Sequence, residues 1–272
     1  MPVHGYLLRN LRVLLLFLSL VLAACSSPSG RYQFTLVHMN DTHSHLEPVA
    51  VNLAIQGETV TAQLGGFARL KTVVDQMRAE DRELLFLHGG DVVQGTLYFT
   101  LFNGVPEFDF LNLLGLDAMT FGNHEFDRGP AVIPAWIKRS RFPWLSANID
   151  FSNEPALAGL VKPYLIKEIH GEKIAIIGVT TETTPQTTMQ VGRVVFNDAV
   201  ESVRKQLAAL EAQGINKIIV LSHLGYQQDR ELAEKVAGVD IVVGGHSHTL
   251  MGDTSLLSKI GLLPETVYPT EL

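Results

Sequence analysis

Residues 113–127, LLGLDAMTFGNHEFD, form the stretch on which the fold and the chemistry of this chain both depend. An apolar run over residues 113–121 ends abruptly at Gly122, and an amide, an imidazole and two acids follow within five residues. A glycine at this point lets the backbone turn sharply at the end of a strand. The stretch therefore indicates a buried strand whose end presents polar side chains.

The polar side chains of this stretch have the chemistry of an active site. Asn123 can offer a carbonyl oxygen to a hard cation, and His124 can move protons near neutral pH. Asp127, three residues further on, can hold the imidazole of His124 in orientation. This stretch alone does not establish an active site, so the prediction also depends on polar clusters elsewhere in the chain.

Short β-rich runs alternate with helical patterns outward from this stretch. We expect strands at residues 34–39, 83–88, 118–121, 144–147, 217–222 and 239–243. We expect helices at residues 67–77, 106–114, 130–139, 198–213 and 229–236, and a hairpin formed by residues 163–169 and 173–180. The alternation predicts an α/β fold with mostly parallel strands flanked by helices.

Five of the expected strands lead into polar clusters. The clusters are Asp41 with His43, Asp91 within GDVVQG, the GNHE stretch at 122–125, His223, and His246 with His248. Open α/β sheets place their working groups just beyond the carboxyl ends of the strands. We therefore expect these five clusters to form one site.

The clusters supply seven candidate metal ligands: Asp41, His43, Asp91, Asn123, His223, His246 and His248. Alternate residues of an extended chain face the same way, so each Asp-x-His or His-x-His pair can grip one cation. The set suits two divalent ions about 3.5–4 Å apart that share a carboxylate and lower the pKa of water to give a nucleophilic hydroxide. Mixed imidazole and carboxylate ligation favours zinc, manganese or cobalt, with magnesium as an alternative.

A single Asp-x-His or His-x-His pair is more often a surface or core feature than a ligand pair. Five clusters at expected strand ends in one sheet are much harder to explain in that way. Of the remaining histidines, His38 and His88 are expected within strands as packing or supporting groups. We expect His45 at the surface and His170 in a turn.

The order Asp-x-His, Gly-Asp-x-x-x-Gly, Gly-Asn-His-Glu, His and Gly-His-x-His resembles the calcineurin-like metallophosphoesterases. The fuller forms NDTH at 40–43, LGGFAR at 64–69 and GNHEFD at 122–127 resemble the exported 5′-nucleotidases, UDP-sugar hydrolases and NAD nucleotidases. The resemblance extends over residues 34–254. It implies a four-layer α/β/β/α sandwich with two mixed sheets, and a structural role at a helix start for residues 64–69.

The resemblance also implies two metal positions that share Asp91. The first would be formed by Asp41, His43, Asp91 and His248, and the second by Asp91, Asn123, His223 and His246. Asn123 and His124 would contact the phosphate, and Asp127 would orient His124. The implied reaction is hydrolysis of 5′-nucleotides, or of the pyrophosphate in NAD or UDP-sugars, by a metal-bridging hydroxide that attacks phosphorus. Some relatives have Gln or Asn where this chain has His248, which could alter its metal preference.

Residues 1–25 are predicted to be a bacterial lipoprotein signal. Arg9 and Arg12 precede an apolar run over residues 11–22 that is too short to span a bilayer comfortably. Cys25 stands where such signals place the lipidated first residue of the mature chain; the alternative is an ordinary signal peptide with an incidental cysteine. Residues 26–33 read as a flexible tether. We therefore expect an exported cell-envelope lipoprotein, on the periplasmic side or at the outer membrane, whose membrane contact is the lipid at Cys25.

The charge balance of the chain bears on which kind of molecule it can bind. Without residues 1–25, which hold two basic and no acidic residues, 19 basic residues oppose 28 acidic ones and the net charge is −9. An acidic chain without a basic run argues against a nucleic-acid polymer as partner. The expected partner, a small nucleotide or dinucleotide, is instead what the resemblance implies. Cys25 is the only cysteine, so stability must come from packing. The sequence does not indicate an oligomeric state.

Residues 34–272 are expected to be the catalytic domain. The related nucleotidases have a further C-terminal domain that grips the nucleotide, and we expect that domain to be absent from this chain. Residues 267–270 resemble the run that follows the last metal motif in those relatives, so we also expect the catalytic domain to be incomplete at its C-terminus. We therefore expect turnover of small activated esters but weak nucleotide affinity. The alternatives are a surface lipoprotein that binds metal without turnover, and an inactive fragment. A proton-transfer pair at His124 and Asp127 argues against mere metal storage.

Overall fold

The run that leads into Gly122 lies inside a parallel four-stranded sheet. The computed structural model describes residues 32–271. The first sheet has the order β1-β4-β5-β6, with bounds Leu36–Met39, Leu85–His88, Ala118–Thr120 and Trp144–Leu145. Every neighbouring pair in it is parallel, with Leu36 opposite Leu85 and Leu87 opposite Ala118. Because β4 and β5 are buried on both faces, they begin with apolar residues that do not alternate with polar ones, and each ends in a buried polar residue, His88 or Thr120.

The second sheet has the order β12-β11-β9-β8, with bounds Ile241–Val243, Ile218–His223, Glu172–Thr180 and Tyr164–Ile169. β11 pairs in parallel with both β9 and β12. β8 and β9 form the predicted hairpin and are antiparallel, with Ile169 opposite Glu172. Of the two sheets, only this one is mixed, because its edge strand β8 reaches β9 through a tight turn rather than a crossover helix.

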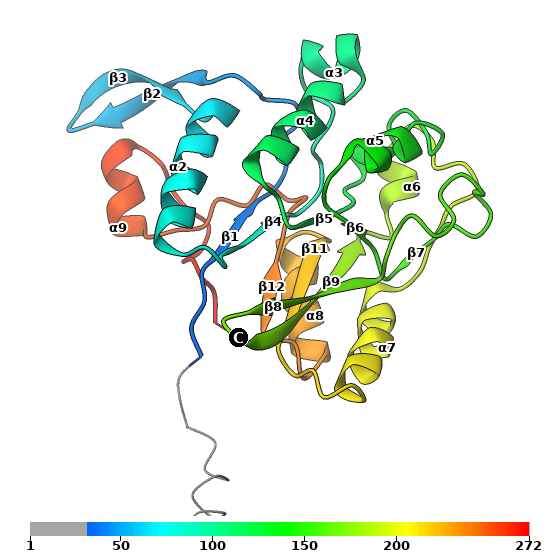
Figure 1. Ribbon diagram of the computed structural model, residues 1–272. Helices are drawn as coiled ribbons and strands as arrows, with labels where there is room; N and C mark the ends of the chain where they lie inside the picture. Colours follow the sequence, from blue (N-terminus) through cyan, green and yellow to red (C-terminus); the bar gives the residue numbers. More distant parts are fainter. Residues whose placement is uncertain (1–31, 272) are drawn as a thin grey trace, which may run out of the picture. The chain divides into compact units, whose positions relative to one another are not determined.

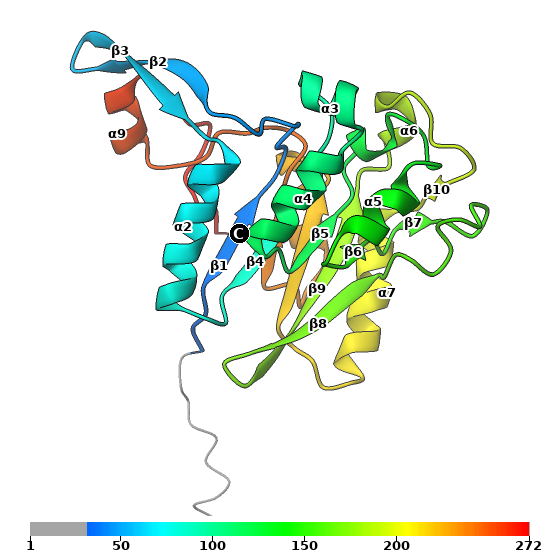
Figure 2. The same ribbon diagram turned by 45° about the horizontal axis from the view of Figure 1, so that its top comes forward.

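Helices cover the outer face of each sheet, and the two sheets face each other (Figures 1 and 2). The helices beside the first sheet are α2 (Phe67–Glu80), α4 (Val105–Leu114) and α5 (Ile133–Arg139). Those beside the second are α7 (Ala199–Glu211) and α8 (Tyr226–Lys235). The predicted four-layer α/β/β/α sandwich is confirmed, but the prediction of two mixed sheets is wrong for the first sheet, whose strand pairs are all parallel.

Buried side chains explain this layering. One apolar cluster joins α4 and α5 to the first sheet and includes Phe108, Trp136 and Trp144. A second cluster joins α7 and α8 to the second sheet through residues such as Val203 and Leu232. Hydrogen bonds connect the two sheets directly, because the Thr120 hydroxyl donates to Val179 O (3.2 Å) and the Thr180 hydroxyl to Phe121 O (2.8 Å). Each helix thus buries one apolar face, and the inner strands β4, β5 and β11 are buried along their whole length.

Several elements were not expected from the sequence. The largest is a hairpin of β2 (Val49–Ile55) and β3 (Glu58–Leu64), whose side chains are mostly exposed and show no clean apolar alternation. The others are α3 (Leu97–Phe102), η1 (His124–Phe126), β7 (Ile149–Asp150) paired with β10 (Val195–Phe196), α6 (Thr184–Thr187), α9 (Thr254–Leu257) and η2 (Ser258–Ile260). All are short or exposed, so burial imposes little pattern on them.

The expected helices at 130–139 and 229–236 have shifted starts. α5 begins at Ile133 because a turn follows η1, and α8 begins at Tyr226, directly after Gly225 in the left-handed region (φ 97°). The stretch at 64–69 opens α2 as predicted, with Gly66 as N-cap and the Arg69 guanidinium donating to Gln63 O (2.5 Å).

Within residues 32–271, no helix is both long enough and apolar enough to cross a bilayer. The predicted signal segment, Cys25 and most of the tether lie outside the described residues.

Candidate metal centre and active site

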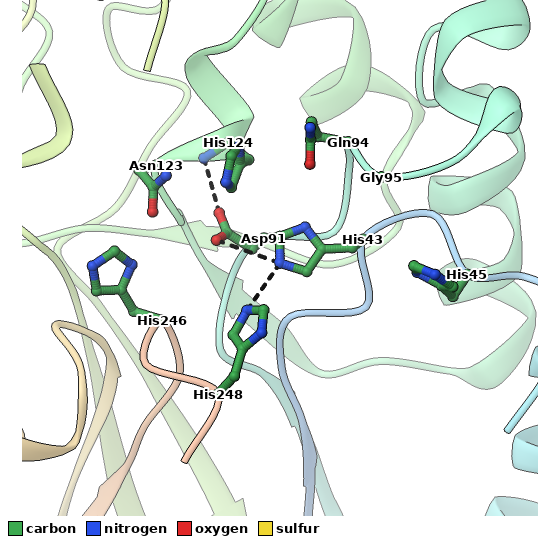
Figure 3. Close-up of a pocket in the computed structure, with 9 residues that line it drawn as sticks. All are labelled: His43, His45, Asp91, Gln94, Gly95, Asn123, His124, His246 and His248. Atoms are coloured by element: carbon green, nitrogen blue, oxygen red, sulfur yellow. Dashed lines mark hydrogen bonds and ion pairs between the residues drawn. The ribbon is translucent and has the colours of Figure 1, made fainter. Parts of the chain in front are cut away.

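The polar clusters meet at the carboxyl edge of the two sheets, around a hollow of about 360 Å³ (Figure 3). Asp41 and His43 follow β1, Asp91 follows β4, Asn123 and His124 follow β5, His223 ends β11, and His246 and His248 follow β12. The side chains that line the hollow are His43, His45, Asp91, Gln94, Asn123, His124, His246 and His248, with Gly95 completing it. Strand ends far apart in the sequence therefore meet in one place.

One group of three donors lies on the β1 side of the hollow. Single ligand atoms of Asp41, His43 and His248 all lie within 4.8 Å of one another. His248 Nε2 is 3.4 Å from Asp41 Oδ1 and 3.1 Å from His43 Nε2. The carboxylate of Asp41 is fixed because it accepts the backbone N–H of His246 at 3.0 and 3.1 Å. These donors could hold one divalent cation.

A second group of donors consists of Asp91, His223 and His246, again within 4.8 Å of one another. His223 Nε2 lies 3.0 Å from Asp91 Oδ2, and His43 Nε2 lies 3.9 Å from the same oxygen. His223 Nδ1 donates to Gly89 O (2.7 Å), which turns Nε2 towards the site. The Asp91 carboxylate thus lies between the two groups, as a bridging ligand would.

An unsatisfied oxygen supports the fit of a cation to this site. Asn123 is 3% exposed, and its Oδ1 is buried without a hydrogen-bond donor among the described residues. A buried carbonyl oxygen without a partner is costly, and a hard cation would satisfy it. Together with carboxylate oxygens and imidazole nitrogens, this donor set fits divalent transition metals.

The electrostatics of the donors also suit a cation. Burial opposes charge on His223, but the nearby Asp91 carboxylate outweighs it and raises the pKa of His223 to about 9. Against the same burial, His223 lowers the pKa of Asp91. A bound cation would take the place of the proton that this pair shares. Burial lowers the pKa of His43 and of His246, which keeps both imidazoles neutral, as metal ligands must be.

His124 and Asp127 form a hydrogen-bonded pair at the edge of the hollow. His124 Nδ1 lies 2.7 Å from Asp127 Oδ2, and this hydrogen bond raises the pKa of His124. The single turn of η1 sets the spacing, because Asp127 N donates to His124 O (3.1 Å). The His124 ring meets that of His43 edge-on, with centroids 5.2 Å apart. The arrangement presents an oriented imidazole beside the metal donors.

Sequence reasoning missed the role of Glu125. This side chain is fully buried and accepts three backbone N–H groups: those of Asp91 (2.9 Å), Val92 (2.8 Å) and Gly122 (2.6 Å). Burial raises the pKa of Glu125 to about 7, and the charge on Asp91 adds to that effect. Glu125 therefore fixes the end of β4 against the end of β5. Its only sequence signal is its place in the GNHE stretch.

The backbone at the site is unusual. Asp41, His43, Asp91, His246 and His248 all have positive φ, between 45° and 76°. Non-glycine residues rarely adopt this region, and such strain clusters at functional sites. Gly122 is required for a related reason, since a Cβ there would collide with the Asp91 carboxylate. The ends of the strands therefore approach each other closely where the metal donors come together.

The remaining histidines fall outside the donor groups. His45 is exposed, as expected, and lies at the rim of the hollow. His88 is buried, which lowers its pKa to about 3, so the neutral ring bonds Thr42 Oγ1 (3.1 Å) and accepts from Gly90 N (3.1 Å). His38 bonds the Tyr268 hydroxyl (2.9 Å). His170 occupies the predicted turn between β8 and β9.

An α/β/β/α sandwich whose sheet edges gather carboxylate, amide and imidazole donors is the arrangement of a metallophosphoesterase. Residues 34–250 match the family described as calcineurin-like phosphoesterase. The chain belongs to this family, as its motifs predicted.

Several relatives share much of the sequence or the fold. A probable 5′-nucleotidase of Treponema pallidum is 39% identical over 259 residues, covering 94% of this chain and 44% of the relative. The crystal structure of a 5′-nucleotidase precursor from Thermus thermophilus superposes with a TM-score of 0.82 at 44% identity, over 88% of this chain and 46% of that one. The NAD nucleotidase of Haemophilus influenzae gives a TM-score of 0.82 at 37% identity, over 88% and 42%. The chain spans less than half the length of each of these relatives.

Proposed function

We propose that the chain is a two-metal phosphoric ester hydrolase acting on 5′-nucleotides, at the phosphate monoester or at the pyrophosphate of NAD or a UDP-sugar. The observation that carries the proposal is the place of Asp91, whose Oδ2 lies 3.0 Å from His223 Nε2 and 3.9 Å from His43 Nε2. The 5′-nucleotidases and the NAD nucleotidase among the relatives support the substrate class.

In this proposal two cations share Asp91, with zinc, manganese or cobalt as the metals. Asp41, His43, Asp91 and His248 would hold the first, and Asp91, Asn123, His223 and His246 the second. Bound divalent cations would lower the pKa of water and polarise the phosphoryl oxygens. The second-sheet ligand His223 is oriented by Gly89 O, and Asp41 by the His246 backbone, so both are held before any ion arrives.

His124 and Asn123 are the proposed phosphate contacts. The hydrogen bond to Asp127 raises the pKa of His124 and so favours its protonated form. A protonated imidazole can stabilise charge that develops on the phosphate or donate a proton to the leaving oxygen. Asp127 keeps Nδ1 engaged, which directs the other ring nitrogen away from that carboxylate and towards the substrate.

The first test is metal-dependent turnover of AMP, NAD and p-nitrophenyl phosphate by the purified chain. We expect chelation to abolish turnover and Mn²⁺, Zn²⁺ or Co²⁺ to restore it. His124→Ala should lower kcat by roughly 10²–10⁴-fold, the usual contribution of a positioned proton-transfer group. Asp91→Asn should abolish metal-dependent turnover, because both cations lose a shared ligand.

The matched control for this test is His170→Asn, an exposed histidine in the β8–β9 turn, which should retain full activity. A wild-type rate in Asp91→Asn or His124→Ala would refute the proposal. Tight metal uptake with no hydrolysis of any of the three esters would instead indicate a metal-binding surface protein without turnover.

We also propose that the chain is exported and attached to a membrane by lipid at Cys25. The support is the sequence of residues 1–25. Mass analysis of the mature N-terminus should show a diacylated or triacylated Cys25, and Cys25→Ala should release the protein from the membrane fraction. An unmodified N-terminus that still includes residues 1–25 would contradict this.

A further inference from the structure

Both carboxylate oxygens of Asp127 are engaged, and only one of them by His124. Asp127 Oδ2 pairs with His124 Nδ1 at 2.7 Å. Asp127 Oδ1 accepts a hydrogen bond from the Thr188 hydroxyl, also at 2.7 Å. The Asp127 side chain is 15% exposed, so protein groups rather than solvent set most of its surroundings. A carboxylate fixed at both oxygens cannot rotate without losing a hydrogen bond.

Thr188 reaches Asp127 from the other sheet. The segment that contains Thr188 leaves β9 at Thr181, whose N–H donates to His223 O (3.1 Å). The short helix α6 follows, and Thr188 ends it with its own N–H bonded to Thr184 O (3.1 Å). Thr184 is fully buried, and its hydroxyl donates to Thr181 O (2.7 Å). Thr188 is thus held by a hydrogen-bonded turn that begins beside a proposed metal ligand.

The segment after Thr188 also packs closely against the turn after Asp127. A Cβ at Gly129 would lie 3.0–3.1 Å from the Gln190 side chain, and Gly129 has φ 73°. Gly129 N in turn donates to Phe126 O (2.8 Å), which ties it to the η1 turn. The Asp127 turn and the Thr188 segment therefore fit together over several residues rather than at one hydroxyl.

We propose that Thr188 is a positioning residue for the His124–Asp127 pair. By donating to Oδ1, it sets the rotation of the Asp127 carboxylate so that Oδ2 faces His124 Nδ1, and it ties this pair from the first sheet to the second sheet, which carries His223. The inference rests on the proposed function, because it assigns Thr188 to the hydrolysis in which His124 contacts the phosphate. Thr188 itself does not line the hollow.

The test compares Thr188→Val, which keeps the shape and removes the hydroxyl, with Thr188→Ser, which keeps the hydroxyl. Groups that orient active-site residues typically contribute about 10- to 100-fold to activity, so Thr188→Val should lower kcat for p-nitrophenyl phosphate by roughly 10- to 100-fold. KM and the number of Mn²⁺ ions bound should not change. Thr188→Ser should recover most of kcat.

Thr187→Val is the matched control, because the Thr187 hydroxyl donates to Thr183 O (3.3 Å) and Thr184 O (3.4 Å) and does not contact Asp127. It should leave kcat unchanged. In an Asp127→Asn background, Thr188→Val should lower kcat little further, since both changes act through the same Asp127 carboxylate. Equal kcat in Thr188→Val and wild type, or fully additive losses in the double variant, would overturn the inference.

A spectroscopic readout separates this inference from the proposed function. The ¹⁵N chemical shift of His124 Nδ1 should change in Thr188→Val, stay unchanged in Thr187→Val and return in Thr188→Ser. The shift reports the hydrogen-bonded pair whether or not the chain turns over a phosphate ester. An inactive wild-type chain with this shift pattern would refute the proposed function and retain the positioning role. An active chain whose His124 Nδ1 shift does not follow this pattern would support the proposed function and refute the positioning role of Thr188.

Discussion

Asp229 is a further buried carboxylate close to the site, and no sequence motif singles it out. It lies in α8, is 8% exposed, and accepts the hydroxyl of Ser222, the residue before His223. A Cβ at Gly244 would collide with its other oxygen. One side chain therefore joins α8 to β11 and presses against the loop that carries His246. Burial raises the pKa of Asp229 to about 7.

This shift predicts how stability depends on pH. The pKa of Asp229 is 3.8 in the reference state and about 7 in the fold, so between these values the folded chain holds a proton that the unfolded chain has lost. The contribution of Asp229 is fully present below pH 3.8 and is lost as pH rises towards 7. Asp229 alone should lower the free energy of unfolding by at most about 1.4 kcal/mol per pH unit within this window.

Urea denaturation of the metal-free chain between pH 4.5 and 8 measures this dependence. Asp229→Asn resembles the protonated carboxyl group, so the variant should gain stability relative to wild type as pH rises, with the difference levelling off above pH 7. Asp75→Asn removes an exposed carboxylate of α2 and serves as control. Parallel pH curves for wild type and Asp229→Asn would show that Asp229 is not protonated in the fold.

At the scale of elements, the site depends on how two adjacent strand ends are held. β4 and β5 pair through only two residue positions, Leu87 with Ala118 and His88 with Met119. Beyond them the Glu125 carboxylate replaces the strand ladder, because it accepts N–H groups from both chain segments. Asp91 keeps its left-handed backbone (φ 55°) within this arrangement. The proposed bridging ligand is thus positioned by a neighbouring element.

Glu125→Gln should therefore weaken both the fold and the metal site. Glutamine has one acceptor oxygen, so at least one of the three N–H groups loses its partner and faces an amide donor instead. An unsatisfied buried group costs about 1–3 kcal/mol, which is the expected drop in the free energy of unfolding. Mn²⁺ titration should show weaker binding in the same variant.

Chemical denaturation and metal titration of Glu80→Gln provide the comparison, because Glu80 is exposed at the end of α2. A Glu125→Gln variant with the stability and metal affinity of wild type would mean that backbone pairing alone sets the strand ends.

At the scale of the whole molecule, the proposed cations would connect the two sheets. Asp41, Asp91 and Asn123 follow strands of the first sheet, whereas His223 and His246 belong to the second. Without an ion, the contacts that connect the sheets include the Asp91–His223 pair, the hydrogen bonds of Thr120 and Thr180, and those of Gly89 O and Asp41 to the two histidines. Binding of metal to the folded chain should therefore stabilise the whole sandwich rather than one loop.

Each site saturated at about 100 times its dissociation constant adds about 2.7 kcal/mol to the free energy of unfolding. We expect Mn²⁺ to raise the urea concentration at the midpoint of a single unfolding transition, and a chelator to reverse this rise. The rise should be lost in Asp91→Asn and kept in His170→Asn. A midpoint that Mn²⁺ leaves unchanged in the wild-type chain would contradict the metal centre.

The fold was largely predictable because its central strands are buried on both faces. Short, mostly apolar runs such as residues 84–87 and 118–121 each stop near a glycine or polar cluster, so their type and approximate ends follow from composition alone. The β2–β3 hairpin and α3 were missed because mostly exposed segments carry no such pattern. Periodicity reports burial, and where burial is slight it predicts little.

The sequence by itself determined which residue types stand at the strand ends, and hence the family and the candidate ligands. Only the tertiary structure decided which backbone groups Glu125 binds, that Asp229 accepts the Ser222 hydroxyl, and that Thr188 reaches Asp127 across 61 positions of sequence. The physical reason is that the end of a strand, and the residues that follow it, are set by the local sequence. Hydrogen bonds between those ends depend on how two sheets and their connections pack, which no local pattern encodes.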